Sequence, residues 1–64
     1  MARTMSLYQS TRFEHKEIDR KFYEYSSLSM EHELSSKLLK ECDGECFIII
    51  TDNDDNYIRS VGVS

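Results

Sequence analysis

The sequence contains no proline and no tryptophan, and its only glycines are Gly44 and Gly62. No stretch has the composition of a linker or a low-complexity segment, and no segment is repeated. The longest apolar run, residues 47–50, has the length of a strand and is far too short to cross a membrane as a helix. The first residues also lack the apolar stretch of a signal peptide. These absences predict a cytoplasmic protein with no membrane association.

The chain length allows one domain, predicted to span residues 1–64. A chain of this size buries only about 60% of the surface that its unfolded form exposes, so its core is small. Such domains are commonly stabilised further by a disulfide, a metal or a partner. The composition, 39% hydrophobic and 31% charged, is too apolar for a disordered tail. The sequence therefore predicts a small folded domain for which a partner is a natural source of added stability.

Acidic residues dominate the second part of the chain. The formal net charge is −4; residues 26–64 hold eight acidic and three basic residues, whereas residues 1–25 hold four acidic and five basic residues. Nonspecific nucleic-acid binding needs several cations on one face, so we expect no direct binding to nucleic acid. An acidic surface steers association with a basic one. The charge pattern therefore favours a larger protein with a basic surface as the partner.

Two elements are well marked in the second half. Residues 29–43 are predicted to form a helix, because Ser29 is a good N-cap, Gly44 follows the last turn, and apolar residues recur at helical spacing. Residues 46–51 and 57–63 are predicted to form a β-hairpin around a turn rich in Asp and Asn. The first of these strands is expected inside the sheet and the second at its edge. The predicted fold class is α+β, with one or two helices packed on an antiparallel sheet that includes this C-terminal hairpin.

The first part of the chain allows two interpretations. Alternating apolar and polar residues around Met5 predict a short strand. Residues 12–25 match a helix, with a capping box that begins at Thr11 and an apolar stripe. The alternative is a strand pair that ends in residues 22–25, which are strand-like in composition. We favour the helix, because a hairpin turn at residues 16–19 would contain no Gly, Asn or Pro.

No motif of a catalytic or metal site is complete. His32 and Glu33 begin the zinc-protease motif H-E-x-x-H, but Ser36 stands where the second histidine is required. The Asp- and Asn-rich turn resembles the start of a calcium loop, but Tyr57 replaces the glycine and Val63 the bidentate glutamate of that loop. No glycine-rich phosphate loop or G-x-S-x-G elbow is present. We therefore expect a protein that is not an enzyme and that holds no metal or other cofactor.

Cys42 and Cys46 are the only cysteines. In a reducing compartment two cysteines are more often free thiols than a bridge, and Cys42 also fits the apolar stripe of the predicted helix. A zinc site would have to recruit His15 and His32, whose separation is far larger than that of the histidines in common zinc motifs. We therefore expect free thiols, with a disulfide formed under oxidation and a metal site as the alternatives.

The strongest candidate for a binding surface is a set of acidic residues with two tyrosines. Three of the acids flank the corner between the predicted helix and the first hairpin strand, and three lie in the hairpin turn. A strand of this length spans about 20 Å, so the two groups are expected at its opposite ends. Tyrosine is enriched in interface hot spots. The alternative is that these charges only keep the surface solvated. The predicted partner-binding residues are Glu41, Asp43, Glu45, Asp52, Asp54, Asp55, Tyr57 and Tyr23.

These observations predict a small acidic inhibitor or adaptor that occupies a basic surface of a larger protein. In build the chain resembles the short early proteins of bacteriophages, including anti-CRISPR and polymerase-blocking proteins. The resemblance rests on size, acidity, the absence of proline and an α+β fold, and on no motif. One alternative is a self-associating structural or regulatory module, such as a homodimer that pairs the Tyr57–Val63 edge. Another is a metal or redox sensor that uses Cys42 and Cys46.

Overall fold

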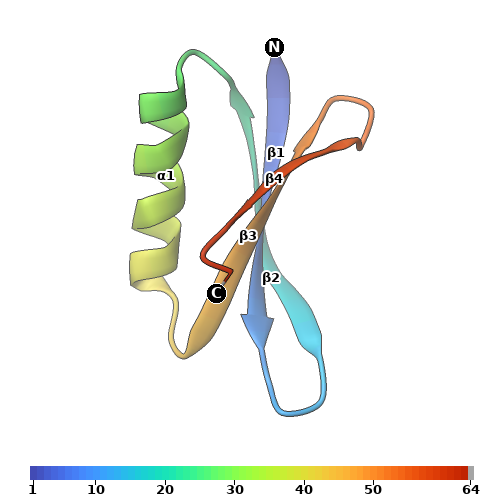
Figure 1. The fold of residues 1–64 in the computed structure, drawn as a ribbon, viewed down its shortest axis with the longest axis vertical. Coiled ribbons are helices and arrows are strands. Elements are labelled where there is room, and N and C mark those ends of the chain that lie inside the picture. The colour runs from blue at the N-terminus through green and yellow to red at the C-terminus, as the bar shows by residue number, and fades with distance from the viewer. Residues whose placement is uncertain (64) are drawn as a thin grey trace.

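The computed structural model describes residues 1–63. Its elements are, in chain order, β1 (Ala2–Ser10), β2 (His15–Glu24), α1 (Leu28–Glu41), β3 (Glu45–Asp52) and β4 (Tyr57–Val61). The strands form one antiparallel sheet in the order β2-β1-β3-β4, and α1 packs on one of its faces (Figure 1). The predicted fold class, α+β with an antiparallel sheet and a C-terminal hairpin, is confirmed. Within residues 1–63 the sheet carries one helix.

The helix predicted at residues 12–25 is wrong, because most of this segment forms the strand β2. β2 pairs with β1 from Ala2 opposite Glu24 to Ser10 opposite His15, with one bulge between. Pairing with β1 satisfies the backbone N–H and C=O groups of β2 that face β1. The stabilisation from this pairing exceeds the helix propensity of the side chains in the segment. The alternative interpretation, a pair of strands, is the correct one.

The turn between β1 and β2 lies at residues 11–14 and closes without Gly, Asn or Pro. The Thr11 hydroxyl oxygen accepts hydrogen bonds from the backbone N–H groups of Phe13 at 3.3 Å and Glu14 at 3.1 Å. The Thr11 N–H donates to the Glu14 carbonyl at 2.8 Å. A threonine side chain therefore supports this turn in place of the commoner turn residues. The Thr-x-x-Glu pattern that resembles a helix capping box belongs here to a hairpin.

Helix α1 lies close to its predicted position. Its N-cap is Ser27 rather than Ser29, and the Ser27 hydroxyl oxygen accepts a hydrogen bond from the Met30 N–H at 3.2 Å. The helix ends at Glu41, and Gly44 follows with a φ of +79°, a conformation that favours glycine. The predicted glycine therefore marks the turn into β3, although it lies one residue further from the helix than expected.

The core lies between α1 and the two central strands. Met5 and Leu7 of β1, Ile48 and Ile50 of β3, and Leu38 of α1 are buried there. Met5 lies opposite Ile50 and Leu7 opposite Ile48, so alternate residues of both strands point toward the helix. As predicted, β3 lies inside the sheet and β4 at its edge.

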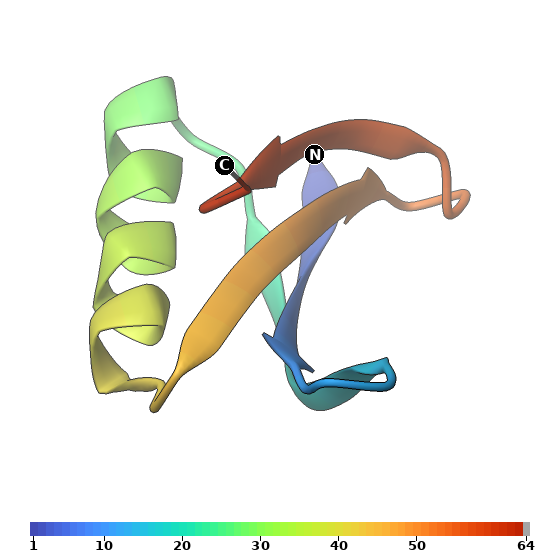
Figure 2. The same cartoon turned by 60° about the horizontal axis from the view of Figure 1, so that its bottom comes forward.

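In the described part of the chain, the other face of the sheet has no helix over it (Figure 2). Tyr8 and Phe47 are cross-strand neighbours on this face and stack with 5.2 Å between their ring centroids. The His15 ring meets Phe47 edge-on at 5.3 Å. Aromatic pairs of these geometries are favourable beyond the area that they bury. Aromatic side chains therefore pack together where a second layer is lacking.

Candidate functional site

Residues 52–56, here called the acidic turn, join β3 to β4. Asp52 Oδ1 accepts hydrogen bonds from the backbone N–H groups of Asp54 at 2.8 Å and Asn56 at 3.0 Å, and Asn56 Nδ2 donates to Asp52 Oδ2 at 3.3 Å. The backbone bonds from Asn56 and Asp54 are the main cause that lowers the pKa of Asp52 below its ordinary value. Asp55 has a φ of +62°, which aspartate tolerates better than most residues. Asp52 is therefore used by the turn itself, while the exposed Asp54 and Asp55 face solvent.

A hollow of about 390 Å³, here called the turn hollow, lies beside the acidic turn. Its apolar lining comes from Met1, Ala2 and Ile58, and its acidic lining comes from Asp52 and Asp54; Arg3 and Asn53 complete it. The N-terminus and the acidic turn lie at the same end of the molecule (Figure 1). An apolar wall beside carboxylates suits a lysine or arginine side chain, whose methylene groups pack on the wall while its charge meets a carboxylate.

Arg3 also belongs to a group of four residues around the buried Glu31, here called the Glu31 cluster. Glu31 of α1 is fully buried and accepts hydrogen bonds from Arg3 Nη1 at 2.8 Å and from the Tyr23 hydroxyl at 2.6 Å. Arg59 Nη2 lies 2.6 Å from Glu31 Oε1, close enough for an ion pair although not aligned as a hydrogen bond. The Arg3 guanidinium also lies 3.7 Å from the centroid of the Tyr25 ring. One carboxylate of the helix thus contacts residues from β1, β2 and β4.

Burial and charge act in opposite directions on the pKa of Glu31. Burial, the largest single influence, raises this pKa, but hydrogen bonds from Tyr23 and Arg3 and the charges of Arg3 and Arg59 outweigh it. The pKa of Glu31 therefore lies below its ordinary value of 4.5. Burial and the hydrogen bond to Glu31 raise the pKa of Tyr23 above its ordinary value of 10.0. At neutral pH Glu31 is charged and Tyr23 is neutral.

The Glu31 cluster contains two arginines for one carboxylate. The charge of Arg3 contributes to the lowered pKa of Asp52, so Asp52 offsets part of this excess of positive charge. Asp52 is thus committed both to the turn and to Arg3. Asp54 and Asp55, the other carboxylates of the acidic turn, are exposed, and the charge of Asp55 contributes to the raised pKa of Arg20.

The other predicted acids, here called the acidic corner, are Glu41, Asp43 and Glu45. Glu41 ends α1, Glu45 begins β3, and all three are exposed. Gln9 Nε2 of β1 donates a hydrogen bond to the Asp43 carbonyl at 2.8 Å. Because β3 separates the acidic corner from the acidic turn by about 25 Å, the structure forms two acidic patches rather than one continuous flank.

Cys42 and Cys46 form a disulfide, so the expectation of free thiols was wrong. The bond joins the C-cap residue of α1 to the second residue of β3, and the two Cα atoms lie 6.5 Å apart, within the range that disulfides span. The prediction rested on the expected compartment. It did not foresee that the turn at Gly44 brings the end of the helix back to the start of the strand.

The two predicted tyrosines lie in different environments. Tyr57 follows the acidic turn, is 63% exposed, and has its hydroxyl 2.8 Å from Ser60 Oγ. Tyr23 is half-buried and its hydroxyl donates to Glu31, so it supports the helix rather than projecting outward. The structure therefore brings Tyr57, but not Tyr23, to the surface beside the acidic turn.

The amino-acid pattern did not predict that Arg3, Glu31 and Arg59 form a group. Acidic residues are ordinary in the first turn of a helix, and Glu31 was not distinguished from its neighbours on that ground. A usable signal was present: Glu31 lies three residues before Leu34 and seven before Leu38, hence on the face that must be buried. A carboxylate on that face requires cationic partners.

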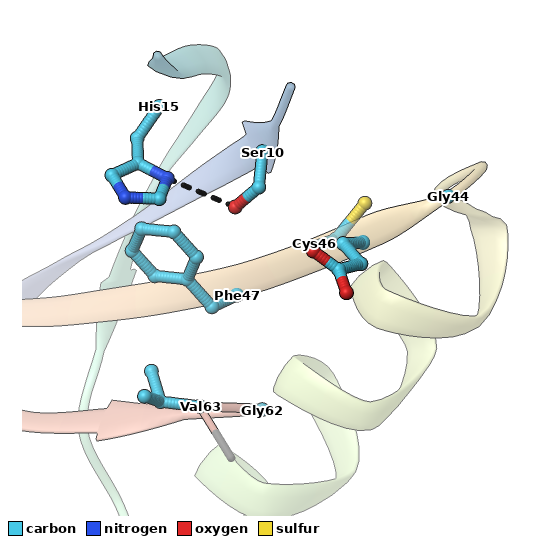
Figure 3. A pocket seen from close by; sticks show the side chains of 8 residues that line it. Ser10, His15, Gly44, Cys46, Phe47, Gly62 and Val63 are labelled. Atoms are coloured by element: carbon cyan, nitrogen blue, oxygen red, sulfur yellow. Dashed lines mark hydrogen bonds between the residues drawn. The ribbon is translucent and has the colours of Figure 1, made fainter. Parts of the chain in front are cut away.

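A second hollow, of about 570 Å³, lies at the acidic corner and is here called the corner hollow (Figure 3). Its lining includes Ser10, His15, Glu45, Cys46 and Phe47. Ser10 Oγ and His15 Nδ1 are hydrogen-bonded at 2.9 Å, a contact between the two strands that meet at the first hairpin turn. A serine–histidine nucleophile also needs a third group that orients the imidazole, and Figure 3 shows the aromatic ring of Phe47 beside His15 rather than a carboxylate.

Within residues 1–63, no three His, Cys, Asp or Glu side chains are grouped so that they could hold a metal ion. Over the same range, no helix is both long enough and apolar enough to cross a membrane. The chain matches no protein-family model, no curated protein and no solved structure. The function must therefore be inferred from the geometry and charge of the two hollows and the residues around them.

Proposed function

We propose that this protein is a small acidic inhibitor or adaptor that binds a basic surface of a larger protein through the turn hollow. One observation carries the proposal: the hollow places the apolar residues Met1, Ala2 and Ile58 beside the acidic residues Asp52 and Asp54. A lysine or arginine from the partner satisfies both requirements at once, because its side chain is apolar along its length and charged at its tip.

The residues of the site take different parts in this binding. Asp54 and Asp55 are exposed and supply the carboxylates that meet the partner's cation. Asp52 holds the turn in shape through its backbone hydrogen bonds, so little conformational entropy is lost when the partner binds. The exposed Tyr57 offers an aromatic surface at the rim of the site.

The net charge of −4 adds to the effect of the local site. A field of one sign raises the rate of encounter with an oppositely charged partner, and salt weakens that effect. The same field opposes phosphate groups, in agreement with the expectation that the chain does not bind nucleic acid directly. We place this binding in the cytoplasm, the compartment expected from the sequence.

The test compares variants of equal charge at two places on the molecule. Asp54→Lys with Asp55→Lys reverses the charge of the acidic turn but leaves Asp52 in place. Glu33→Lys with Glu41→Lys makes the same change in net charge on exposed positions of α1. Each tagged protein captures its partner from lysate at low salt and at roughly 0.5 M salt, where the screening length falls to roughly 4 Å. Mass spectrometry identifies the partner.

We expect the wild type to capture one dominant larger protein at low salt and to lose it at high salt. The variant of the acidic turn should bind about tenfold more weakly, while the helix variant keeps most of its affinity. Equal losses in both variants would show that only net charge matters and that the turn hollow is not the site. Recovery of the protein itself alone would favour the homodimer.

A further inference from the structure

The outer edge of β2 offers a second interaction surface, which does not depend on the proposed function. We propose that β2 pairs with the β2 strand of a second copy of this chain, antiparallel and about a two-fold axis at Phe22, so that the sheets of the two copies become continuous. Three features of the structure support this pairing: an unpaired strand edge, an exposed aromatic ring on that strand, and charges that complement themselves in this register.

The two edges of the sheet differ in length. In the order β2-β1-β3-β4, β2 and β4 each have one edge with which no strand of residues 1–63 pairs. β4 has five residues, whereas β2 has ten, and most side chains of β2 are exposed. Short edge strands and bulges limit pairing with other chains. The bulge between β1 and β2 lies before Asp19, so residues 19–24 form an uninterrupted template for another strand.

Phe22 lies on this edge strand and is 77% exposed. Alternate residues of a strand point to opposite faces of the sheet. Tyr23 contacts Glu31 on the α1 side, so Phe22 lies on the face opposite α1, and Arg20 and Glu24 lie on that face with it. Pairing two copies at Phe22 buries one exposed ring against the other, which is favourable.

Symmetry restricts the register of such a pair. In an antiparallel pair about a two-fold axis, the residue at the axis lies opposite itself, and residues at equal distances from it lie opposite each other. Side chains that lie opposite each other share a face of the sheet, so the axis lies at a residue and not between two residues. The uninterrupted part of β2 therefore allows six registers, one for each of residues 19–24.

Charge selects one of these registers. An axis at any charged residue of 19–24 brings two like charges together, which is destabilising. An axis at Tyr23 places Phe22 opposite Glu24 and pairs no opposite charges. An axis at Phe22 brings the two rings together and places Arg20 of each copy opposite Glu24 of the other. Two ion pairs then flank the two rings on the face opposite α1.

Arg20 and Glu24 each have an atom for this contact beyond those that they use within one copy. Arg20 donates from Nε to Glu17 Oε1 at 2.6 Å and from Nη2 to Glu17 Oε2 at 3.0 Å. Glu24 accepts through Oε1 from the N-terminal amine of Met1. Arg20 Nη1 and Glu24 Oε2 are therefore the atoms that meet across the axis.

The test measures self-association by sedimentation equilibrium from micromolar to millimolar concentration. Arg20→Glu makes both positions acidic and Glu24→Arg makes both basic, so each variant places like charges opposite each other in the dimer. Both changes in one chain restore opposite charges in exchanged order. Lys37→Glu and Glu33→Arg, at exposed positions of α1, are matched controls with the same changes in net charge.

A second pair of variants tests the aromatic contact. Phe22→Ala removes the ring at the axis, and Phe13→Ala removes a ring that is 90% exposed in the turn between β1 and β2. Hydrogen exchange at low and at high concentration locates the interface, because pairing protects backbone N–H groups. Circular dichroism shows that each variant keeps the fold.

We expect a wild-type dimer with a micromolar dissociation constant, because the interface is small. Protection of residues 19–24 should rise with concentration. Arg20→Glu, Glu24→Arg and Phe22→Ala should each weaken the dimer about tenfold, since symmetry applies every change twice. Glu24→Arg reduces the net negative charge, so repulsion between whole molecules does not explain a weaker dimer in that variant. The chain with both charge reversals and the three controls should associate like the wild type.

Three results would overturn the proposal. The first is a protein that stays monomeric at millimolar concentration, which would leave the edge of β2 for a strand of a different protein. The second is a dimer in which protection rises in β4, because the alternative edge, Tyr57–Val63, would then form the interface. The third is a double charge reversal that associates as weakly as the single ones, because it would show that Arg20 and Glu24 do not meet.

Discussion

The two ends of helix α1 are attached to the sheet by different chemistry. At the first turn, Glu31 contacts Arg3, Tyr23 and Arg59, three residues that come from three different strands. At the last turn, a disulfide joins residues 42 and 46, which are four positions apart. The first attachment is non-covalent and draws on three strands, whereas the second is covalent and local.

This difference determines which conditions disturb each end. The Glu31 cluster depends on the ionisation of Glu31 and is insensitive to reductants. The disulfide is insensitive to moderate changes of pH and is broken by reductants. The small domain thus attaches its helix through the Glu31 cluster and through the disulfide. Acid should weaken the first attachment, and reductants should break the second.

The largest effect is expected for Glu31→Gln. This change leaves Arg3 and Arg59 near each other without a counter-charge, and loss of one partner of a buried ion pair typically costs 3–5 kcal/mol. Because the Arg3 and Arg59 side chains keep 18% and 33% of their exposure, we expect a loss near the lower limit, about 3 kcal/mol. Urea denaturation followed by circular dichroism measures it.

The matched control for that experiment is Glu33→Gln, an equal change two positions along the same helix at an exposed site. It should alter the free energy of unfolding by no more than about 0.5 kcal/mol. If the two variants are equally stable, the Glu31 cluster does not hold the helix.

Reduction of Cys42–Cys46 should have an intermediate effect. The bond closes a loop of only about five residues, so the chain-entropy model gives a loss of about 2 kcal/mol. Melting with and without a phosphine reductant measures this loss. Cys42→Ser with Cys46→Ser should melt like the reduced protein and should not respond to the reductant. A reductant effect in the double variant would place the sensitivity outside the disulfide.

A moderate change of pH should be the mildest change, because Glu31 keeps its charge and Tyr23 keeps its proton over a wide range around neutral pH. The pKa of Glu31 is lowered in the folded state, so its contribution is present above its ordinary value of 4.5 and is lost as the pH falls through the folded pKa. The pKa of Tyr23 is raised, so stability is lost as the pH rises above 10.0. Stability should be greatest between these values.

Two variants assign the limits of that pH range. The free energy of unfolding, measured by urea denaturation from about pH 3 to about pH 11, should fall less at acidic pH in Glu31→Gln than in the wild type. It should fall less at alkaline pH in Tyr23→Phe. If the free energy of unfolding falls as much in these variants as in the wild type at both ends of the range, other groups cause the pH dependence.

The sequence predicted well those elements whose signals are local. The helix and the C-terminal hairpin were identified because caps, turn residues and apolar spacing all lie within the elements themselves. The positions of β3 inside the sheet and β4 at its edge followed from their apolar content. The acidic turn was located for the same reason, since Asp and Asn cluster between the two strands.

The errors fall where the outcome depends on distant residues. β2 contains many good helix formers, and only the long strand β1 beside it makes a strand the better structure. The disulfide depends on the corner at Gly44, whose direction no residue count reveals. Tyr23 was expected at the surface, yet it points to Glu31 because β2 lies in the sheet with α1 over it.

The sequence alone thus determined the fold class, the helix, the C-terminal hairpin and the separation of two acidic groups by one strand. These properties follow from propensity, periodicity and turn chemistry, which act between neighbours along the chain. The tertiary structure alone decided that Glu31 meets Arg3, Tyr23 and Arg59, and that an apolar wall stands beside the acidic turn. Such contacts join positions from both halves of the chain, so they exist only once the sheet has paired and the helix has packed on it.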